Sequence, residues 1–496
     1  MPDRKRVLVF IVAYNAERHI SKVLARIPPS IFADYDYEIL IIDDSSSDRT
    51  FAAAKLYQSQ HAGLRITVLF NPHNLGYGGN QKLGYFYAIE HGYDVVVLLH
   101  GDGQYAPELL EDMIRPVLEG QADAVMGSRF MESGHARRGG MPRYKYVGNR
   151  VLSFLQNRML GTRLSEFHSG YRAYSVRALS QIPFQRNSDD FHFDTQILIQ
   201  LLMAGFTLRE IPIPTYYGDE ICHVNGLRYA WNVLKATALS RAHALSILYQ
   251  REYDIAGDSS RDYGSKLGYL SSHSMAVERV KENSTVLELG CGQGYVSQEL
   301  KAKGCVVVGC DVSPLQHRER VDEFHCVDLN RVEDMPAADR FDVILLLDVL
   351  EHLAEPERLL DCLRATAKRK GPRVIITAPN IAFFVQRVQL LLGHFNYGRQ
   401  GILDLTHRRL FTFRSLRKLC AGAGYRVTRI EGIPAPFPKA IGLNGLSRFL
   451  LRANLGLIRV SRGLFAYQIY MEAEPTPVVG ELLAYAVAES AARSEK

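Results

Sequence analysis

The sequence predicts two α/β domains in tandem, and three observations support this prediction. Short runs rich in Val, Ile and Leu alternate with helix-length segments, the pattern of a mainly parallel sheet with helical crossovers. The alternation stops at about residues 250–275, a stretch rich in Ser, Asp, Gly and Tyr, and then restarts. The chain has 496 residues, 47% hydrophobic and 23% charged, which is enough for two sizeable cores. We therefore expect a domain over 1–245, a linker over 246–275, a second domain over 276–474 and a mobile tail over 475–496.

The strands are expected where apolar runs are continuous, because strands covered on both faces lack polar alternation. In the first half these runs are residues 7–14, 37–43, 65–70, 94–100 and 122–130, followed by helical patterns from about Asn187 and near residue 227. In the second half they are residues 284–290, 306–311, 341–349, 373–379 and 425–432, and residues 465–475 are expected to add an edge strand.

Composition excludes several classes of function. The formal net charge of +6, from 59 basic and 53 acidic residues, is too small over this length to indicate nucleic acid as a partner. The seven cysteines are scattered without a Cys-x-x-Cys pair, which argues against a disulfide framework or zinc ribbon and for a reducing compartment. No apolar run reaches the ~18 residues of a spanning helix. The apolar residues 7–13 lead into Tyr14 without a small-residue cleavage site, so they are interpreted as a buried strand and not as a signal peptide. We expect a cytoplasmic protein, with peripheral contact at the inner face of the membrane as an open alternative.

Three polar clusters follow the expected strands of the first domain: Ala13–Glu17, Asp43–Thr50 and His100–Gln104. Ligands of open α/β sheets bind outside the carboxyl ends of strands. Carboxylates that converge there suit a cation and a diphosphate. Each cluster alone is also typical of an ordinary turn or helix N-cap, so the prediction depends on all three occurring in order.

These clusters carry a family resemblance. Residues 6 to about 240 resemble the inverting family 2 glycosyltransferases, and within them the polyprenyl-phosphate branch typified by dolichyl-phosphate-mannose synthases. The matching stretches are VAYNAERHI, ILIIDDSSSDRT, NLGYGGNQKLG, GDGQYAPELL, GSRF, SGYRAYS and EIPIPTYYG. The resemblance implies a GT-A-type fold, a GDP- or UDP-linked sugar donor, and a glycan or polyprenyl-phosphate acceptor.

The same resemblance implies roles for individual residues. It implies that Ala13, Tyr14, Glu17 and Asp44 bind the nucleotide base and ribose. It also implies that Asp102 and Gln104 are ligands of Mg²⁺ or Mn²⁺, and that this metal neutralises charge on the diphosphate. The family usually has an Asp-x-Asp motif here, and in this chain His100 stands at its first position. Imidazole suits Mn²⁺ better than Mg²⁺. The alternative for His100 is a hydrogen-bonded crevice histidine.

Two further residues are candidates in this domain. Arg172 is expected to meet a phosphate, because its planar fork suits phosphate oxygens, or else to pair with a local carboxylate. Asp194 is the candidate base, which a sugar hydroxyl acceptor would need and an ionised acceptor phosphate would not. The loop residues Arg137, Arg138, Arg143 and Lys145 either receive an anionic acceptor or are solvated, and Asp219 and Glu220 stand where lipid-phosphate enzymes often carry basic residues.

The second domain opens with a strand and a Gly-rich turn, residues 286–294. A dinucleotide fingerprint would need a third glycine at position 295, which is Tyr. The Gly-x-Gly-x-Gly form preceded by Glu288 instead resembles class I S-adenosylmethionine-dependent methyltransferases, over about residues 276–472. The resemblance gives cofactor binding to Glu288, Gly290, Gly292 and Gly294, to Asp311 at the ribose, to Asp328 near the adenine, and to Asp348 at the end of the fourth strand.

The motifs D-V-L-E-H-L, A-P-N and G-I-L-D-x-T-H-x-R-x-F-T resemble O-methyltransferases acting on small molecules and glycans. A hydroxyl acceptor benefits from a base with a pKa near neutrality, which histidine supplies. His407 and His352 are the candidates, and each could instead be a structural, hydrogen-bonded histidine.

Taken together, these features predict a bifunctional transferase of surface glycan or glycolipid biosynthesis. It would transfer a sugar with inversion and methylate a hydroxyl on the same product or on an unrelated partner. In the alternative, only one domain is catalytic and the other is a ligand-binding scaffold or sensor.

Overall fold

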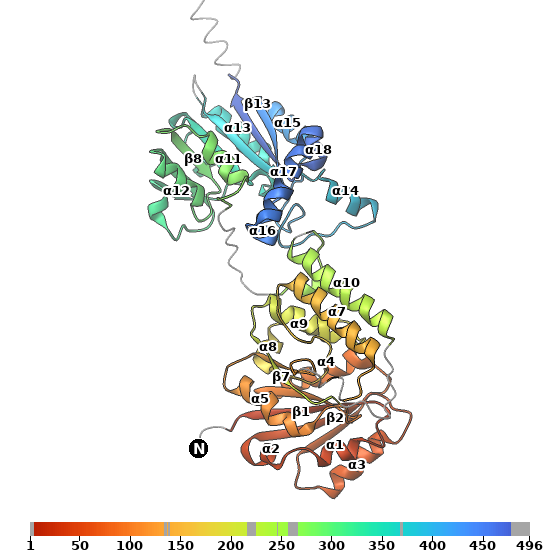
Figure 1. Ribbon diagram of the computed structural model, residues 1–496. Coiled ribbons are helices and arrows are strands. Elements are labelled where there is room, and N and C mark those ends of the chain that lie inside the picture. The colour runs from red at the N-terminus through yellow and green to blue at the C-terminus, as the bar shows by residue number, and fades with distance from the viewer. Residues whose placement is uncertain are drawn as a thin grey trace, which may run out of the picture. The chain divides into compact units, whose positions relative to one another are not determined.

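The computed structural model of the protein describes residues 4–132, 136, 139–215, 225–245, 247–255, 266–367 and 371–477. The chain divides into two compact units, Met1–Ala244 with Gln250–Ser259, and Leu245–Tyr249 with Ser260–Lys496 (Figure 1). Each unit contains one seven-stranded sheet. The chain passes from one unit to the other after residues 244, 249 and 259; the first of these points lies just before the predicted linker, and the other two lie within it. Residues 478–496 of the predicted tail lie outside the described residues.

The sheet of the first unit has the strand order β3-β2-β1-β4-β6-β5-β7. Strand β6 runs antiparallel to both of its neighbours, and the other pairs are parallel. The strands are β1 (Arg6–Ala13), β2 (Asp36–Asp43), β3 (Ile66–Phe70), β4 (Val95–His100), β5 (Ala124–Ser128), β6 (Arg172–Ser175) and β7 (Leu208–Pro212).

Helices cover both faces of this sheet, as the continuous apolar runs predict. Successive side chains of a strand point to opposite faces, so Val7 and Val9 join the core beneath one helical layer and Leu8 and Phe10 join the other. The first layer contains α1 (Ile20–Ala25), α2 (Pro29–Asp34), α3 (Thr50–Gln60) and α5 (Leu110–Leu118). The second contains α4 (Gly76–Glu90), α8 (Val176–Ser180) and α9 (Phe193–Met203), and the unit also includes α7 (Arg143–Leu160) and α10 (Gly226–Ala244).

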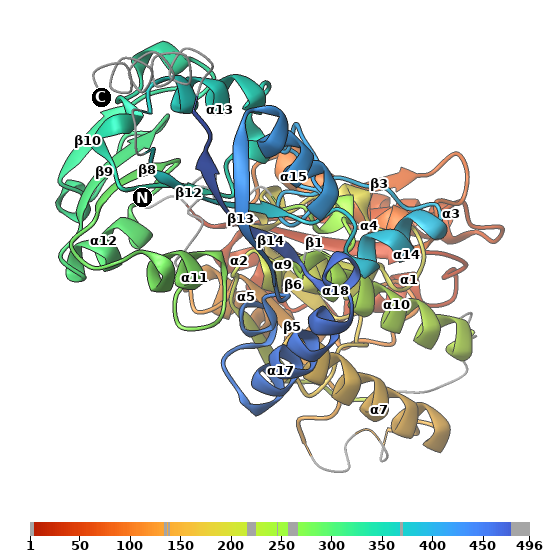
Figure 2. The same cartoon turned by 90° about the horizontal axis from the view of Figure 1, so that it is seen from above.

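The sheet of the second unit has the order β10-β9-β8-β11-β12-β14-β13. Its strands are β8 (Thr285–Leu289), β9 (Val306–Asp311), β10 (Glu323–Cys326), β11 (Val343–Leu347), β12 (Arg373–Pro379), β13 (Tyr425–Ile433) and β14 (Gln468–Pro475). The prediction that residues 465–475 form an edge strand is wrong. Strand β14 pairs antiparallel with β12 on one side and β13 on the other, so β13 is the edge (Figure 2).

Helices α11 (Ser272–Arg279) and α12 (Tyr295–Ala302) pack on one face of this second sheet, and α13 (Pro356–Ala365) and α15 (Phe413–Gly422) pack on the other. The remaining helices are α14 (Phe384–Leu391), α16 (Phe437–Ile441), α17 (Gly445–Val460) and α18 (Arg462–Phe465). Within the described part of the chain, no helix has both the length and the apolarity needed to cross a bilayer.

Three strands escaped the sequence analysis: β6, β7 and β10. Each has only four or five residues and contains charged or partly exposed positions, so none reads as an apolar run. The parallel strands nevertheless bring the predicted polar clusters to the carboxyl edge of each sheet. Ala13 lies beside Asp43 in register, and Val12 lies beside His100.

Candidate functional sites

The first site lies at the carboxyl ends of β1, β2 and β4, where two loops bind each other. The side chain of Asn15 accepts hydrogen bonds from the amide of Ser47 at 2.9 Å and from its hydroxyl at 3.1 Å. The amide of Asn15 donates to Ser46 Oγ at 2.8 Å, and the amide of Glu17 donates to Asp48 Oδ2 at 3.1 Å. Asn15 holds the left-handed backbone conformation, with φ of 50°, that this turn requires. The two predicted nucleotide-binding loops therefore form one rigid rim.

Of the residues predicted to hold the nucleotide, Ala13 is buried at the strand end and Tyr14 is 47% exposed on the rim. Asp44 has a structural set of partners. Its Oδ1 accepts from the Leu75 amide at 2.9 Å and its Oδ2 from the Gly76 amide at 3.0 Å, at the start of α4. The neighbouring Asp43 is fully buried, and its Oδ2 has no hydrogen-bond partner among the described residues. The free acceptor at this strand end is therefore on Asp43, which the sequence analysis did not select.

His100 takes part in a chain of hydrogen bonds within the domain. Its Nε2 lies 3.1 Å from the hydroxyl of Tyr77, and that hydroxyl donates its one proton to Asp194 Oδ2 at 3.0 Å. The Tyr77 oxygen must therefore accept a proton from Nε2, which leaves the lone pair of the neutral ring on Nδ1. Burial lowers the pKa of His100, which favours this neutral ring. The contacts of Nε2 are those of a hydrogen-bonded crevice histidine, and the metal role of His100, which Nδ1 would have to serve, stays a prediction.

Asp102 keeps the position expected of a metal ligand. It is half-buried just beyond β4, and its Oδ1 accepts from the Gln104 amide at 2.9 Å. The side chain of Gln104 is likewise half-buried at this edge. A carboxylate and an amide oxygen fit Mg²⁺ or Mn²⁺, provided that a bound diphosphate supplies further oxygen ligands.

Arg172 is buried completely beneath this edge. Its Nε donates to the carbonyl of Ser169 at 2.8 Å, Nη1 to the carbonyl of Asp194 at 2.7 Å, and Nη2 to the carbonyl of Phe167 at 2.8 Å. Nη2 also lies 4.0 Å from Asp194 Oδ2. With its donors directed at protein oxygens, Arg172 serves the scaffold, and the structure favours pairing with a local carboxylate over contact with a substrate phosphate.

Asp194, the candidate base, is 5% exposed near the start of α9. The Tyr77 hydroxyl and the Gln81 amide, at 3.2 Å from Oδ1, hold its two oxygens in place. Neither Tyr77 nor Gln81 was selected from the sequence, although both lie in the NLGYGGNQKLG stretch. The arrangement fixes the orientation of Asp194, and its catalytic role stays a prediction. Arg137, Arg138, Asp219 and Glu220 lie outside the described residues.

The second site begins at the Gly-rich turn after β8. Gly290, Gly292 and Gly294 have φ of 72°, 54° and 71°, a region that side chains rarely adopt. A Cβ on Gly290 would lie 2.7 Å from Val349 Cγ2, whereas a Cβ on Gly292 would meet open space. The sequence therefore needs glycine at 290 for packing, and Gly292 leaves room for a ligand.

Two of the predicted cofactor carboxylates flank this turn. Asp311 ends β9, and its Oδ2 accepts from the Gly292 amide at 2.9 Å. Glu288 is buried within β8, and its Oε2 accepts the hydroxyl of Ser297. Burial raises the pKa of Glu288 to about 7, so this carboxyl is half protonated at neutral pH. Asp328 is exposed, and hydrogen bonds from Asn330 lower its pKa.

Asp348 follows β11 in a left-handed conformation, with φ of 57°. Its Oδ1 accepts from the Thr377 hydroxyl at 2.8 Å, and its Oδ2 lies 2.8 Å from Lys266 Nζ. Gln468 Nε2 donates to both oxygens at 2.8 Å. Although burial alone would raise the pKa of Asp348, the Lys266 ammonium holds it well below its usual range. Lys266 was missed because the sequence analysis placed it in the linker.

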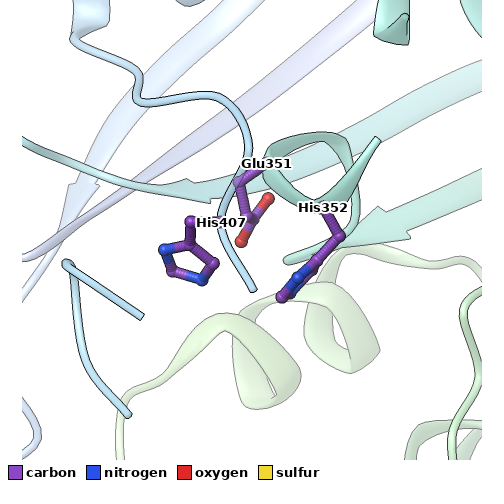
Figure 3. A group of neighbouring side chains, drawn as sticks. All are labelled: Glu351, His352 and His407. Atoms are coloured by element: carbon purple, nitrogen blue, oxygen red, sulfur yellow. The ribbon is translucent and has the colours of Figure 1, made fainter. Parts of the chain in front are cut away.

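The candidate bases His352 and His407 lie together, with ring centroids 4.9 Å apart. Between the rings lies the carboxylate of Glu351, which is 1% exposed (Figure 3). Burial and the nearby Asp348 raise the pKa of Glu351 well above its usual range. Burial and the neighbouring His407 lower the pKa of His352. Glu351 stands in the D-V-L-E-H-L motif, but the sequence analysis assigned no role to it.

Both domains match the models of known protein families. Residues 8–182 match the model described as glycosyl transferase family 2, and residues 263–430 match the model described as methyltransferase domain. Together with the two sheets, these matches confirm the predicted fold class, a GT-A-type α/β domain followed by a Rossmann-like methyltransferase domain.

The first domain is also similar to curated proteins. UDP-N-acetylglucosamine–dolichyl-phosphate N-acetylglucosaminyltransferase of Methanococcus voltae is 28% identical over 226 residues, which are 43% of this chain and 87% of that protein. Polyprenol monophosphomannose synthase of Mycolicibacterium smegmatis is 28% identical over 210 residues, 42% of this chain and 77% of that protein. Undecaprenyl-phosphate mannosyltransferase of Micrococcus luteus is 28% identical over 209 residues, 42% of this chain and 82% of that protein.

Proposed function

We propose a bifunctional activity for this chain, which joins a glycosyl transferase family 2 domain to a methyltransferase domain and is therefore a transferase. The first domain transfers a sugar from a GDP- or UDP-sugar, with inversion, to a polyprenyl-phosphate or glycan acceptor. The second methylates a hydroxyl with S-adenosylmethionine, in the biosynthesis of a surface glycan or glycolipid. The observation that carries the proposal is that one chain contains both families, each with its polar clusters at the carboxyl edge of its sheet.

In the first domain, the rim formed by Tyr14 and Glu17 would bind the nucleoside, with Asp43 as an additional acceptor beside Asp44. Asp102 and Gln104 would hold Mg²⁺ or Mn²⁺, which neutralises charge on the diphosphate leaving group. An acceptor phosphate attacks without a base, since it is already ionised. A sugar hydroxyl would give its proton to Asp194, which Tyr77 and Gln81 keep oriented.

A polyprenyl-phosphate acceptor agrees with the names of the three relatives, and such an acceptor would be met at a membrane surface. Helix α7 supports this part of the proposal. It exposes Tyr144, Val147 and Phe154 by 73%, 57% and 68%, and its charged residues, Arg143, Lys145, Arg150 and Arg158, are all basic. Exposed apolar and basic side chains on one helix are typical of contact with anionic lipid. We accordingly propose that the protein works at the cytoplasmic membrane face.

In the second domain, the Gly-rich turn, Asp311 and Asp328 would bind S-adenosylmethionine. The acceptor hydroxyl would lose its proton to Nε2 of His407 or His352 while its oxygen displaces the sulfonium in line. The scaffold or sensor alternative differs from this proposal in one respect: one of the domains would bind its ligand without turnover.

Sugar transfer is tested by incubating the full chain with radiolabelled GDP- and UDP-sugars, Mn²⁺ and a lipid extract. We expect label to become lipid-soluble with one donor, and Asp102→Asn to reduce this by at least about 100-fold. Glu108→Gln is the matched control, because Glu108 is an exposed carboxylate of the same domain paired with Arg26. Sugar transfer that survives Asp102→Asn would contradict the metal assignment, and binding without transfer would favour the scaffold alternative.

Methyl-donor binding is tested by calorimetry with S-adenosylmethionine. We expect Gly292→Arg to abolish this binding, because its side chain would enter the open space at the turn, and to leave sugar-nucleotide binding unchanged. A second glycine of this domain, Gly304, does not provide a control, because a Cβ there would lie 2.5 Å from Asn283 Oδ1 and would disturb the fold. The control is Lys281→Arg, a conservative change at an exposed position of the same domain, and its binding of S-adenosylmethionine should match that of the wild type.

Membrane contact is tested by cosedimentation with vesicles of anionic or zwitterionic phospholipid. We expect binding to anionic vesicles and a loss on Phe154→Ser. Leu56→Ser, on α3 with 58% exposure, is the matched control and should bind normally. Equal sedimentation of both variants would argue against α7 as the contact.

A further inference from the structure

The side chains of Glu351, His352 and His407 form a cluster. They come from two segments that backbone hydrogen bonds hold together. Glu351 and His352 lie in the short 3₁₀ turn Leu350–His352 after β11, and His407 lies in a loop some fifty residues later. The amides of Arg408 and Arg409 donate to the carbonyl of Glu351 at 2.7 and 3.0 Å. The loop that carries His407 is therefore fixed against the turn before any ligand binds.

Each imidazole has its Nδ1 directed at a backbone carbonyl. His407 Nδ1 lies 2.9 Å from the carbonyl of Ile402, and His352 Nδ1 lies 3.3 Å from the carbonyl of Thr406. A carbonyl oxygen only accepts, so each Nδ1 must carry the proton. Each Nε2 then has a free lone pair, which is the arrangement that carbonyl partners impose on metal-binding histidines.

The carboxylate of Glu351 completes the cluster. Both of its oxygens are buried, and neither has a hydrogen-bond partner among the described residues. Ligand atoms from Glu351, His352 and His407 all lie within 4.8 Å of one another, and no other trio of His, Cys, Asp or Glu in the described ranges meets this condition. Figure 3 shows the carboxylate between the two rings. A buried carboxyl group whose two oxygens lack partners is costly, and a cation between these groups would stabilise its ionised form and supply the missing partner.

We propose that Glu351, His352 and His407 bind one divalent first-row transition metal, of which Zn²⁺ best suits two imidazole nitrogens and one carboxylate oxygen. Three protein ligands leave a coordination position open, as in catalytic rather than structural zinc sites.

The open position also suggests a role, which rests on the proposed methyl transfer. A hydroxyl of the acceptor that coordinates the metal becomes more acidic and releases its proton to water. The oxygen then forms a bond to the methyl carbon, and the carbon–sulfur pair stays on sulfur as S-adenosylhomocysteine leaves. The metal would thus replace the two histidines as the means of activating the hydroxyl, since their Nε2 lone pairs would be occupied.

The test is metal titration of the full chain in an Asp102→Asn background, which removes the proposed metal ligand of the first domain. After dialysis against a chelator, Zn²⁺ binding is measured by calorimetry and Co²⁺ binding by visible absorption. We expect one equivalent of each metal, and an affinity at least about 100-fold lower for Glu351→Gln and for His407→Asn. His325→Asn is the control, because His325 pairs with Glu323 at 2.8 Å in the same domain but outside the cluster.

Binding of S-adenosylmethionine in each variant shows whether the domain is folded. A wild-type cluster that takes up neither Zn²⁺, Co²⁺ nor Mn²⁺ stoichiometrically, while still binding the methyl donor, would overturn the metal site and leave the methyltransferase assignment standing. Stoichiometric metal that is lost in both cluster variants but kept in His325→Asn would establish the site, whether or not methyl transfer is detected. Unchanged affinity in both cluster variants would place the metal elsewhere and overturn the proposal.

Discussion

The two domains differ in how the carboxyl groups enclosed beneath the ligand edge are compensated. In the first, two enclosed carboxylates lie beside buried guanidinium groups: Glu166 pairs with Arg129, and Asp194 Oδ2 lies 4.0 Å from Arg172 Nη2. In the second, Glu288 and Glu351 are buried, and no cationic side chain forms an ion pair with either in the described structure. Asp348, by contrast, is paired with Lys266.

This difference agrees with what each edge is proposed to bind. A nucleotide-sugar brings its own negative charge, which suits a domain with cations beneath the edge and the proposed metal ligand Asp102 at the rim. S-adenosylmethionine carries a positive sulfonium, and carboxyl groups around it are complementary. Through His168 in the first domain and Glu288 in the second, the stabilities of the two domains should respond in opposite directions to pH.

The largest expected effect comes from Arg172→Met. The substitution leaves three carbonyls without a donor and the Asp194 carboxylate without its nearest cation, and breaking such a buried arrangement typically costs about 3–5 kcal/mol. We expect sugar transfer to be lost and thermal unfolding of the first domain to occur well below that of the wild type. Binding of S-adenosylmethionine, measured by calorimetry, should be retained.

The matched control for this experiment is Arg177→Met, because Arg177 is 71% exposed and pairs with Asp123 at the surface. Arg177→Met should lower the free energy of unfolding by less than about 1 kcal/mol. Equal unfolding of the two variants would mean that Arg172 does not hold the first domain together.

The pH dependence of the first domain should reveal His168. Burial, reinforced by Arg129 and Arg172, lowers the pKa of His168 to about 3, whereas the unfolded chain protonates it near 6.5. The folded state therefore binds fewer protons, and its stability falls as the pH drops from 6.5 toward 3. Between pH 6.5 and 4.5 the free energy of unfolding should fall by about 2 kcal/mol through His168, and the His168→Phe variant should lack this contribution. Urea unfolding at a series of pH values measures this change in the free energy of unfolding. If the wild type and His168→Phe showed the same dependence on pH, His168 would not be the group responsible.

The sequence predicted most of the fold because buried parallel strands and amphipathic helices leave local patterns. It predicted contacts poorly where the partners are distant in the chain. The carbonyl of Asp194, which accepts from Arg172 Nη1, lies 22 residues away, and β14 was placed at an edge because its pairing with β13 has no local signature. The composition of residues 250–275, rich in Ser, Asp, Gly and Tyr, resembled that of a linker. In the structure, however, Lys266 from this stretch contacts Asp348.

The second domain should show the opposite pH dependence through Glu288. Burial raises its pKa to about 7, and the unfolded chain releases the proton near 4.5. The folded state therefore holds more protons between these values, and its stability falls as the pH rises from 4.5 to 7. Between pH 5 and 6.5 the difference between wild type and Glu288→Gln should change by about 2 kcal/mol. Denaturant unfolding followed by loss of S-adenosylmethionine binding reports this domain, and a difference that is constant with pH would show that Glu288 is ionised when folded.

The smallest effect is expected at Asp328, because it is exposed and its proposed role is to bind the cofactor and not to pack in the core. Hydrogen bonds from Asn330 lower the pKa of Asp328, so the carboxylate is ionised and ready to accept from the cofactor at neutral pH. Asp328→Asn should weaken S-adenosylmethionine binding about 10-fold in calorimetry, equivalent to about 1.4 kcal/mol, and leave thermal stability unchanged. Asp334→Asn, at an exposed position six residues later, is the control and should bind as the wild type does. If the two variants bind equally well, the cofactor does not reach Asp328, and the acidic surroundings of the donor are limited to the buried carboxyl groups and Asp311.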